Sequence, residues 1–183
     1  MAKKTDSLEL LLDFGIDEKT RSISLFGDVN EDMLHDLNVG MSHLEKINNE
    51  TITIRLSTHG GSVAYGLAII DRITSSVCET HIHAAGEICS MGIFILASGS
   101  VRTASPLTMF MHHETSYDFD DKHSSNKNYV KFNDKLDDRM CRWLAKKTKK
   151  DFLFWKKAGV GVDHWFFAEE ALDYGLIDEI MGD

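Results

Sequence analysis

The chain has 183 residues, 43% of them hydrophobic, which is enough to bury the core of one domain. Its formal net charge of −9 argues against a general nucleic-acid-binding protein, and no apolar run is long enough to span a membrane. The three cysteines are odd in number and lack the spacing of metal ligands, so we expect no disulfide framework, no metal site and a reducing, cytoplasmic compartment.

The first half of the sequence switches repeatedly between the hydrophobic period of a strand and that of a helix. Residues 1–20 show no clear period, and we expect them to form an N-terminal arm. Helices are predicted to begin near Asn30 and after Gly61, where apolar residues recur at helical spacing. Alternating and β-branched residues predict strands at 22–26, 51–56 and 80–84. This repeated order of strand and helix predicts an α/β domain.

The second half continues with shorter elements and one long helix. Pro106 separates two short strands, and a helix predicted at about 125–150 carries apolar and aromatic residues on one side. That side either covers the sheet of its own chain or packs between subunits. The other predicted elements are a buried helix at 91–96, strands at 101–104 and 108–113, a helix at 168–174 and a strand at 176–180.

A serine lies between an extended apolar run and the start of an apolar helix, in the segment Gly86–Gly92. At such a turn the hydroxyl group lies at the open end of the sheet, and the first amides of the helix can receive a developing oxyanion. Serine is a weak nucleophile by itself, so it needs a base and an orienting acid. Ser90 is therefore a candidate nucleophile that requires partners elsewhere in the chain.

Candidates for these partners occur at three places. His112 and His113 end a predicted strand, and because strand side chains alternate, only one of them can face the serine; alternation does not decide which. The pair Gly60–Gly61 forms either a simple tight turn or an oxyanion donor that reinforces the Met91 amide. Asp163 precedes an aromatic run and is a candidate acid, one among 29 acidic residues.

Four motifs follow one another in a recognisable order: Gly60–Val63, Gly86–Gly92, Met111–His113, and Asp163 with Ala171–Asp178. Together they resemble the proteolytic subunit of the Clp protease family (ClpP), over nearly the whole chain. The resemblance implies a crotonase-like spiral of β-β-α units that forms a globular head over residues 21–183. It also implies a projecting handle helix at about 117–155, and a possible axial role for residues 1–20.

The resemblance further implies a serine endopeptidase with a Ser-His-Asp triad. Ser90 would be the nucleophile, His113 the base and Asp163 the orienting acid. The amides of Gly61 and Met91 would bind the oxyanion. An extended peptide substrate would pair with the backbone near Gly60, Ser62, Val63 and Glu114.

The same resemblance implies the partners of the protein. We expect a homo-oligomeric ring, a heptamer that can stack into a tetradecamer, which cleaves unfolded proteins and short peptides inside its chamber. An AAA+ Clp ATPase would unfold the substrates, and ATP would be used only by that partner. No cofactor, nucleic acid or membrane is expected to bind the chain.

The sequence departs from the family pattern at several positions. His59 replaces the proline before the paired glycines, and Cys89 replaces a common alanine. A polar, acidic segment at 117–125 replaces a glycine-rich strand that helps two rings to meet. Val162 replaces the arginine that links this ring contact to the triad. These changes bear on ring stacking more than on the catalytic groups.

Three other functions fit parts of the sequence. The chain could be a noncatalytic or regulatory ring subunit, although the intact candidates Ser90, His113 and Asp163 argue against this. It could be a specialised processing peptidase, for example one that matures a viral capsid precursor. An acyl-CoA enzyme of the crotonase class ranks last, because it would have no need for this triad.

Overall fold

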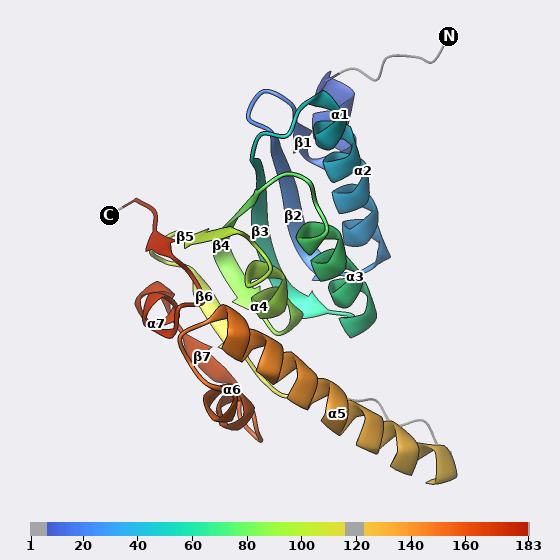
Figure 1. The fold of residues 1–183 in the computed structure, drawn as a ribbon, viewed down its shortest axis with the longest axis vertical. Helices are drawn as coiled ribbons and strands as arrows, with labels where there is room; N and C mark the ends of the chain where they lie inside the picture. Colours follow the sequence, from blue (N-terminus) through green and yellow to red (C-terminus); the bar gives the residue numbers. More distant parts are fainter. Residues whose placement is uncertain (1–6, 116–122, 183) are drawn as a thin grey trace.

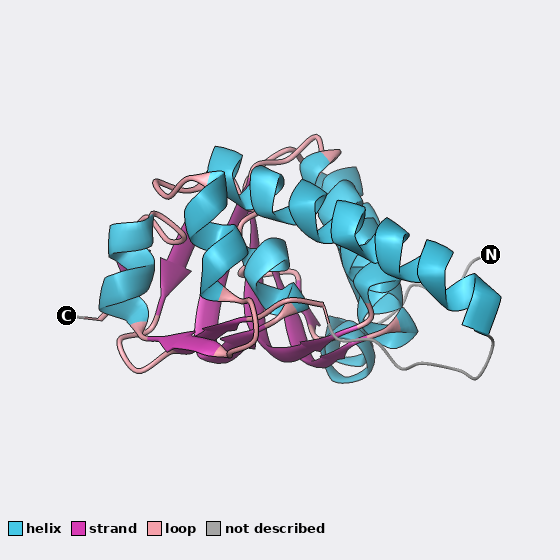
Figure 2. Ribbon diagram, turned by 90° about the horizontal axis from the view of Figure 1, so that it is seen from below, coloured by secondary structure: helices cyan, strands magenta, loops and turns pink. Residues whose placement is uncertain are grey.

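The computed structural model describes residues 7–115 and 123–182, which form one eight-stranded sheet with helices packed against it (Figures 1 and 2). Figure 2 shows most of the helices over one face of the sheet. The elements, in chain order, are α1 (Ser7–Phe14), β1 (Ile16–Asp17), β2 (Ser22–Val29), α2 (Glu31–Ile47), β3 (Ile52–Gly61), α3 (Val63–Thr74), β4 (Thr80–Cys89), α4 (Met91–Leu96), β5 (Val101–Ala104), β6 (Met109–His112), α5 (His123–Lys147), α6 (Phe152–Ala158), β7 (His164–Phe166), α7 (Ala168–Tyr174) and β8 (Glu179–Ile180).

The sheet divides at β4, and this division places the candidate site. The main strand order is β1-β2-β3-β4-β5-β8, with parallel pairing from β2 to β8 and antiparallel pairing of β1 with β2. Residues 81–84 of β4 pair with β5, whereas residues 87–89 pair with β6. Gly86, with a φ of 71°, lies between the two pairings. The end of β4 therefore lies beside β6 rather than beside β5.

The core forms where alternating strand residues meet the apolar faces of the helices. In β3, Ile52, Ile54 and Leu56 are fully buried, while the residues between them are partly or fully exposed. Helix α2 begins at the predicted cap, since the Asn30 side chain accepts a hydrogen bond of 3.0 Å from the Met33 amide. The predicted alternation of strands and helices over the first half of the chain is thus confirmed.

The N-terminal segment differs from the expected arm. Helix α1 buries Leu10, and β1 pairs with β2 so that Ile16 is fully buried. From residue 7 onward, the segment is therefore attached to the head through Leu10 and β1, although most of α1 is exposed. Residues 1–6 lie outside the described residues, and an axial role for them stays a prediction.

The long predicted helix is present as α5, which extends beyond the sheet (Figure 1). Its second half packs on its own chain, because Met140, Cys141 and Leu144 are buried. Nearer its start, Phe132 is 60% exposed, whereas the adjacent Asn133 is buried. Within the described residues, no helix is both long and apolar enough to cross a membrane.

Two elements near the C-terminus were not predicted. Helix α6 begins at Asp151, whose side chain accepts a hydrogen bond of 2.8 Å from the Phe154 amide. Strand β7 pairs antiparallel with β6. The strand expected at 176–180 is confined to the two residues of β8. The polar segment expected to replace a ring-contact strand lies mostly outside the described residues.

Candidate active site

Ser90 occupies a sharp turn between β4 and α4. Its φ of 53° and ψ of −118° lie in a region that favours glycine, and its side chain makes no capping hydrogen bond to α4. The Ser90 amide donates a hydrogen bond of 2.8 Å to the Met111 carbonyl of β6, which holds the turn against the neighbouring strand. Such strain costs of order 1–3 kcal/mol and concentrates at functional sites. The hydroxyl group is thus directed away from the helix it precedes.

The paired glycines allow two chain segments to approach closely. Gly60 has a φ of 103°, and a Cβ there would lie 2.7 Å from Ser90 Cβ and 3.3 Å from the Met91 nitrogen. Gly61 has a φ of 144°, and a Cβ there would lie 2.6 Å from the Val29 carbonyl oxygen. Only glycine fits at either position without displacing backbone. The end of β3 therefore lies directly against the serine turn.

His113 is the histidine that faces the serine. Its Nε2 lies 2.7 Å from Ser90 Oγ. The pairing of β4 with β6 explains this, because Ser90 contacts Met111 and His113 follows two residues later, on the same face of the strand. His112 points to the other face, where it is buried and its Nε2 lies 3.0 Å from the Trp155 carbonyl oxygen. The structure thus decides between His113 and His112, a choice that the alternation of strand side chains could not make.

Asp163 lies near His113 but does not form a hydrogen bond with it. Its Oδ1 is 3.8 Å from His113 Nδ1, and its side chain is 57% exposed. It reaches this place because it precedes β7, which pairs with β6 so that His112 lies opposite His164. Three segments that are far apart in the sequence therefore bring Ser90, His113 and Asp163 together.

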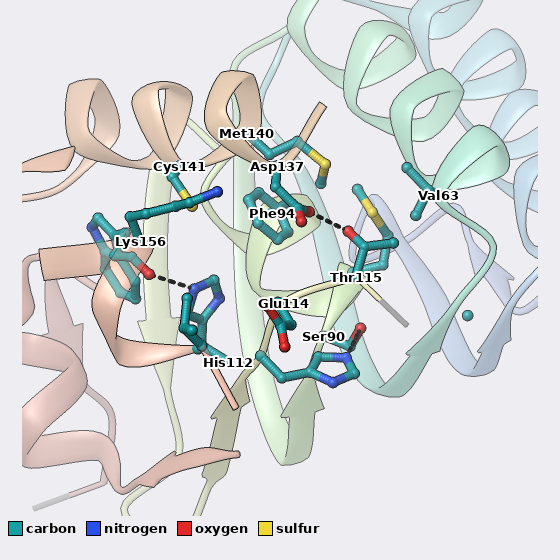
Figure 3. A pocket seen from close by; sticks show the side chains of 16 residues that line it. Val63, Ser90, Phe94, His112, Glu114, Thr115, Asp137, Met140, Cys141 and Lys156 are labelled. Carbon is teal, nitrogen blue, oxygen red and sulfur yellow. Dashed lines mark hydrogen bonds between the residues drawn. The ribbon is translucent and has the colours of Figure 1, made fainter. Parts of the chain in front are cut away.

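A cavity of about 90 Å³ adjoins Ser90 and His113 (Figure 3). Gly61, Val63 and Met91, for which oxyanion and substrate roles were predicted, are among the residues that line it. Residues of α5 and α6 form its far end. Sequence reasoning missed these residues, and the capping aspartate before α6 was a signal that could have revealed that helix. The other lining residues are His112, which was a candidate base, and nine that were not predicted near the site: Phe94, Thr115, Asp137, Met140, Cys141, Trp155, Lys156, Gly159 and Val160.

Two of the predicted substrate-binding residues make contacts within the chain. The Glu114 amide donates a hydrogen bond of 3.1 Å to the Gly159 carbonyl, so it is not available to pair with a substrate strand. The Glu114 carboxylate accepts a hydrogen bond of 3.3 Å from the Gly161 amide. Ser62 caps α3, and its amide donates to the Val29 carbonyl at 2.8 Å.

The residues that depart from the family pattern lie around the site without blocking it. His59 is exposed, and its Nε2 lies 2.5 Å from a carboxylate oxygen of Asp28. Cys89 is buried, and this burial raises the pKa of its thiol to about 11, so it does not compete with Ser90 as a nucleophile at neutral pH. Val162 is 63% exposed beside Asp163.

Comparison with known proteins assigns the family. The family model described as Clp protease matches residues 14–183, most of the chain and all of the candidate site. The chain belongs to the Clp protease family. A solved structure of a ClpP1 point mutant from Listeria monocytogenes is similar to it with a TM-score of 0.82 and 26% sequence identity, covering 90% of this chain and 93% of that one. The ClpP-like α/β fold implied by the sequence motifs is thus confirmed.

Proposed function

We propose that this Clp protease family member is a serine endopeptidase with Ser90 as nucleophile, His113 as general base and Asp163 as orienting acid. The observation that carries the proposal is the 2.7 Å contact between Ser90 Oγ and His113 Nε2, because a nucleophile and its base must be within hydrogen-bond reach. The strained turn at Ser90 supports it further.

The reaction would proceed in two stages. Ser90 Oγ attacks the carbonyl carbon of the scissile peptide bond while its proton passes to His113 Nε2. The tetrahedral intermediate collapses, the C–N bond breaks, and His113 gives the proton to the departing amine. Water then attacks the acyl ester in the same way and frees Ser90. Each stage uses His113 once as base and once as acid.

The oxyanion of the intermediate would be bound by the amides of Gly61 and Met91. Both residues line the cavity beside Ser90, and Met91 is the first residue of α4, where amides lack partners within the helix. A single oxyanion donor typically contributes about 10²–10³ in rate. Two donors and a positioned histidine would together account for most of the catalysis.

Asp163 would fix the orientation of the His113 ring and stabilise the imidazolium ion. The present separation of 3.8 Å is longer than a hydrogen bond, so the carboxylate must approach His113 by about 1 Å in the active arrangement. The exposure of the Asp163 side chain and its place just before a short strand leave room for this movement.

We also propose that the chain acts in the cytoplasm as a homo-oligomeric ring, a heptamer that can stack into a tetradecamer, with an AAA+ Clp ATPase as unfoldase. The exposure of Phe132 on α5 supports a contact between subunits. Unfolded proteins and short peptides would be the substrates. An extended peptide would lie along Gly60–Val63 and pair through backbone groups that are not already bonded within the chain, which excludes the amides of Gly60, Ser62 and Glu114.

The proposal is tested by the hydrolysis of an unfolded protein and of a short fluorogenic peptide, with and without a Clp ATPase. The variant Ser90→Ala should lose activity by roughly 10⁴-fold or more, because it removes the oxygen that forms the acyl ester. Ser75→Ala, which changes an exposed serine at the end of α3, should behave as wild type. Full activity of Ser90→Ala would refute the proposal, and cleavage confined to one partner protein would favour a processing peptidase instead.

A further inference from the structure

The cavity beside Ser90 is placed to receive a substrate side chain. Ser90 and Met91 line one end, so the side chain of the residue whose carbonyl group Ser90 attacks would enter it. Figure 3 shows Ser90 at one end of this space and Asp137, Cys141 and Lys156 near α5 at the other. The inference that follows rests on the proposed peptidase function and concerns which side chain the cavity selects.

The volume of the cavity excludes large side chains. At about 90 Å³ it is smaller than the cavity of roughly 150 Å³ that holds a benzene molecule in another protein. An aromatic side chain would therefore have to displace the walls. Those walls are well packed, since Trp155 is fully buried and Met140 nearly so. The cavity suits a slender side chain of four or five heavy atoms.

His112 lines this cavity and carries a buried hydrogen-bond acceptor without a partner among the described residues. Its side chain is 3% exposed, and its Nε2 donates to the Trp155 carbonyl, so Nδ1 carries the lone pair and points away from Trp155. Among the described residues, Nδ1 has no hydrogen-bond partner. Burial lowers the pKa of His112 to about 4, which keeps the ring neutral at pH 7. A buried acceptor without a donor is unfavourable, and a donor on the substrate would relieve this.

Two charged residues add to the polarity of the inner end. The Asp137 carboxylate accepts a hydrogen bond from the Thr115 hydroxyl, and a carboxylate can accept several more. The Lys156 ammonium group lies 2.9 Å from a carboxylate oxygen of Asp138 and carries three protons, so it can also donate into the cavity. The inner end thus offers two kinds of acceptor and one donor.

We propose that this cavity selects glutamine, and less strongly asparagine, as the residue before the cleaved bond. The carboxamide N–H groups would donate to His112 Nδ1 and to Asp137, and its carbonyl oxygen would accept from Lys156. Methionine has nearly the same length and volume but offers no donor. Glutamate would bring its charge close to the carboxylates of Asp137 and Glu114. A polar site of this kind discriminates against analogues that lack the donor.

The test compares fluorogenic peptides that differ only in the residue before the cleaved bond: glutamine, methionine, phenylalanine, glutamate or lysine. We expect kcat/KM for the glutamine peptide to exceed that for the methionine peptide by at least about tenfold. Phenylalanine should be cleaved more slowly still. A preference for methionine, phenylalanine or lysine over glutamine would overturn the proposal.

A variant on α5 tests whether the preference for glutamine arises from this cavity. Asp137→Leu keeps the approximate volume but removes an acceptor, so the glutamine-to-methionine ratio should fall at least fivefold while methionine cleavage persists. Asp134→Leu, which changes an exposed residue one turn earlier on α5, should leave the ratio unchanged. An unchanged ratio in Asp137→Leu would contradict the assignment.

Labelling of Ser90 by a fluorophosphonate separates this proposal from the peptidase function on which it rests. If Ser90 is labelled and peptides are cleaved without preference for glutamine, the function stands and the selectivity is wrong. If Ser90 is not labelled and no peptide is cleaved, both are wrong. Labelling of Asp137→Leu at the wild-type rate shows that the variant retains a folded site.

Discussion

The conformation of Ser90 depends on its neighbours on both sides. A φ of 53° is unfavourable for serine, and it persists because β6 holds the Ser90 amide while Gly60 leaves room for the side chain. The gain is that Oγ points at His113 instead of capping α4. The strained turn at Ser90 and the absence of a side chain at Gly60 thus together orient the candidate nucleophile.

The buried His112 should make the stability of the protein depend on pH. Its pKa is about 4 in the folded state because burial disfavours the charged ring, whereas an unfolded histidine titrates near 6.5. The unfolded state therefore binds more protons between these values. Stability from this residue is complete above about pH 6.5 and falls as the pH drops toward 4, by about 3 kcal/mol in total.

Urea unfolding of wild type and His112→Gln at pH 7 and pH 4.5 measures this effect. Glutamine can still donate to the Trp155 carbonyl but does not titrate. The free energy of unfolding should fall more steeply with acid in wild type than in the variant. Equal pH dependence in the two proteins would show that His112 is not the group responsible.

At the scale of elements, periodicity predicted the helices and strands whose apolar residues pack on a single core. Strand β3 alternates strictly, and α2 and α3 bury one face each, so local pattern and tertiary burial agree. Helix α6 was missed although the Asp151 cap marks its start, and strand β7 has only three residues, too few to show an alternation. Their positions depend on pairing with β6 and packing under α5, which local sequence does not specify.

Sequence motifs were enough to predict which three residues form the candidate triad, but not how these residues are arranged in space. The choice of His113 over His112 depends on the register between β4 and β6, which sets Ser90 beside Met111. The distance from His113 to Asp163 depends on β7, which was not predicted. The cavity lining was missed because Asp137 and Lys156 come from α5 and α6, and local sequence does not specify how these helices pack beside the serine.

Helix α5 should contribute to assembly through the exposed Phe132. Phe132 is 60% exposed there, and burying such a side chain against another subunit typically contributes about 1.5–3 kcal/mol. The variant Phe132→Ser should therefore shift the native mass from a ring of seven or more chains toward smaller species. Lys131→Ser, which changes the preceding exposed residue, should leave the native mass unchanged.

Native mass spectrometry at several protein concentrations measures this shift. A ring in wild type that dissociates more readily in Phe132→Ser would support the contact. If wild type is monomeric at all concentrations, or if both variants assemble as wild type does, α5 does not hold subunits together through Phe132.

At the scale of the whole molecule, the candidate site exists only because the fold joins distant segments. The end of β3 supplies the glycines, the β4–α4 turn supplies Ser90, the end of β6 supplies His113, and the approach to β7 supplies Asp163. In the divided sheet, β6 lies between β4 and β7. Pairing of β6 with these two strands therefore brings both Ser90 and Asp163 close to His113. The chemistry proposed for the protein therefore depends on the arrangement of strands as much as on the residues.

The central claim is that Ser90 is a nucleophile activated by His113, and fluorophosphonate labelling followed by peptide mass spectrometry tests it most directly. The serine oxygen displaces fluoride and leaves a stable phosphonyl ester, so the modified residue can be read from the mass of its peptide. We predict an adduct on Ser90 in wild type, none in Ser90→Ala, and labelling of His113→Ala that is slower by about 10²-fold or more. An adduct on a different residue, or equal labelling rates in wild type and His113→Ala, would contradict the account.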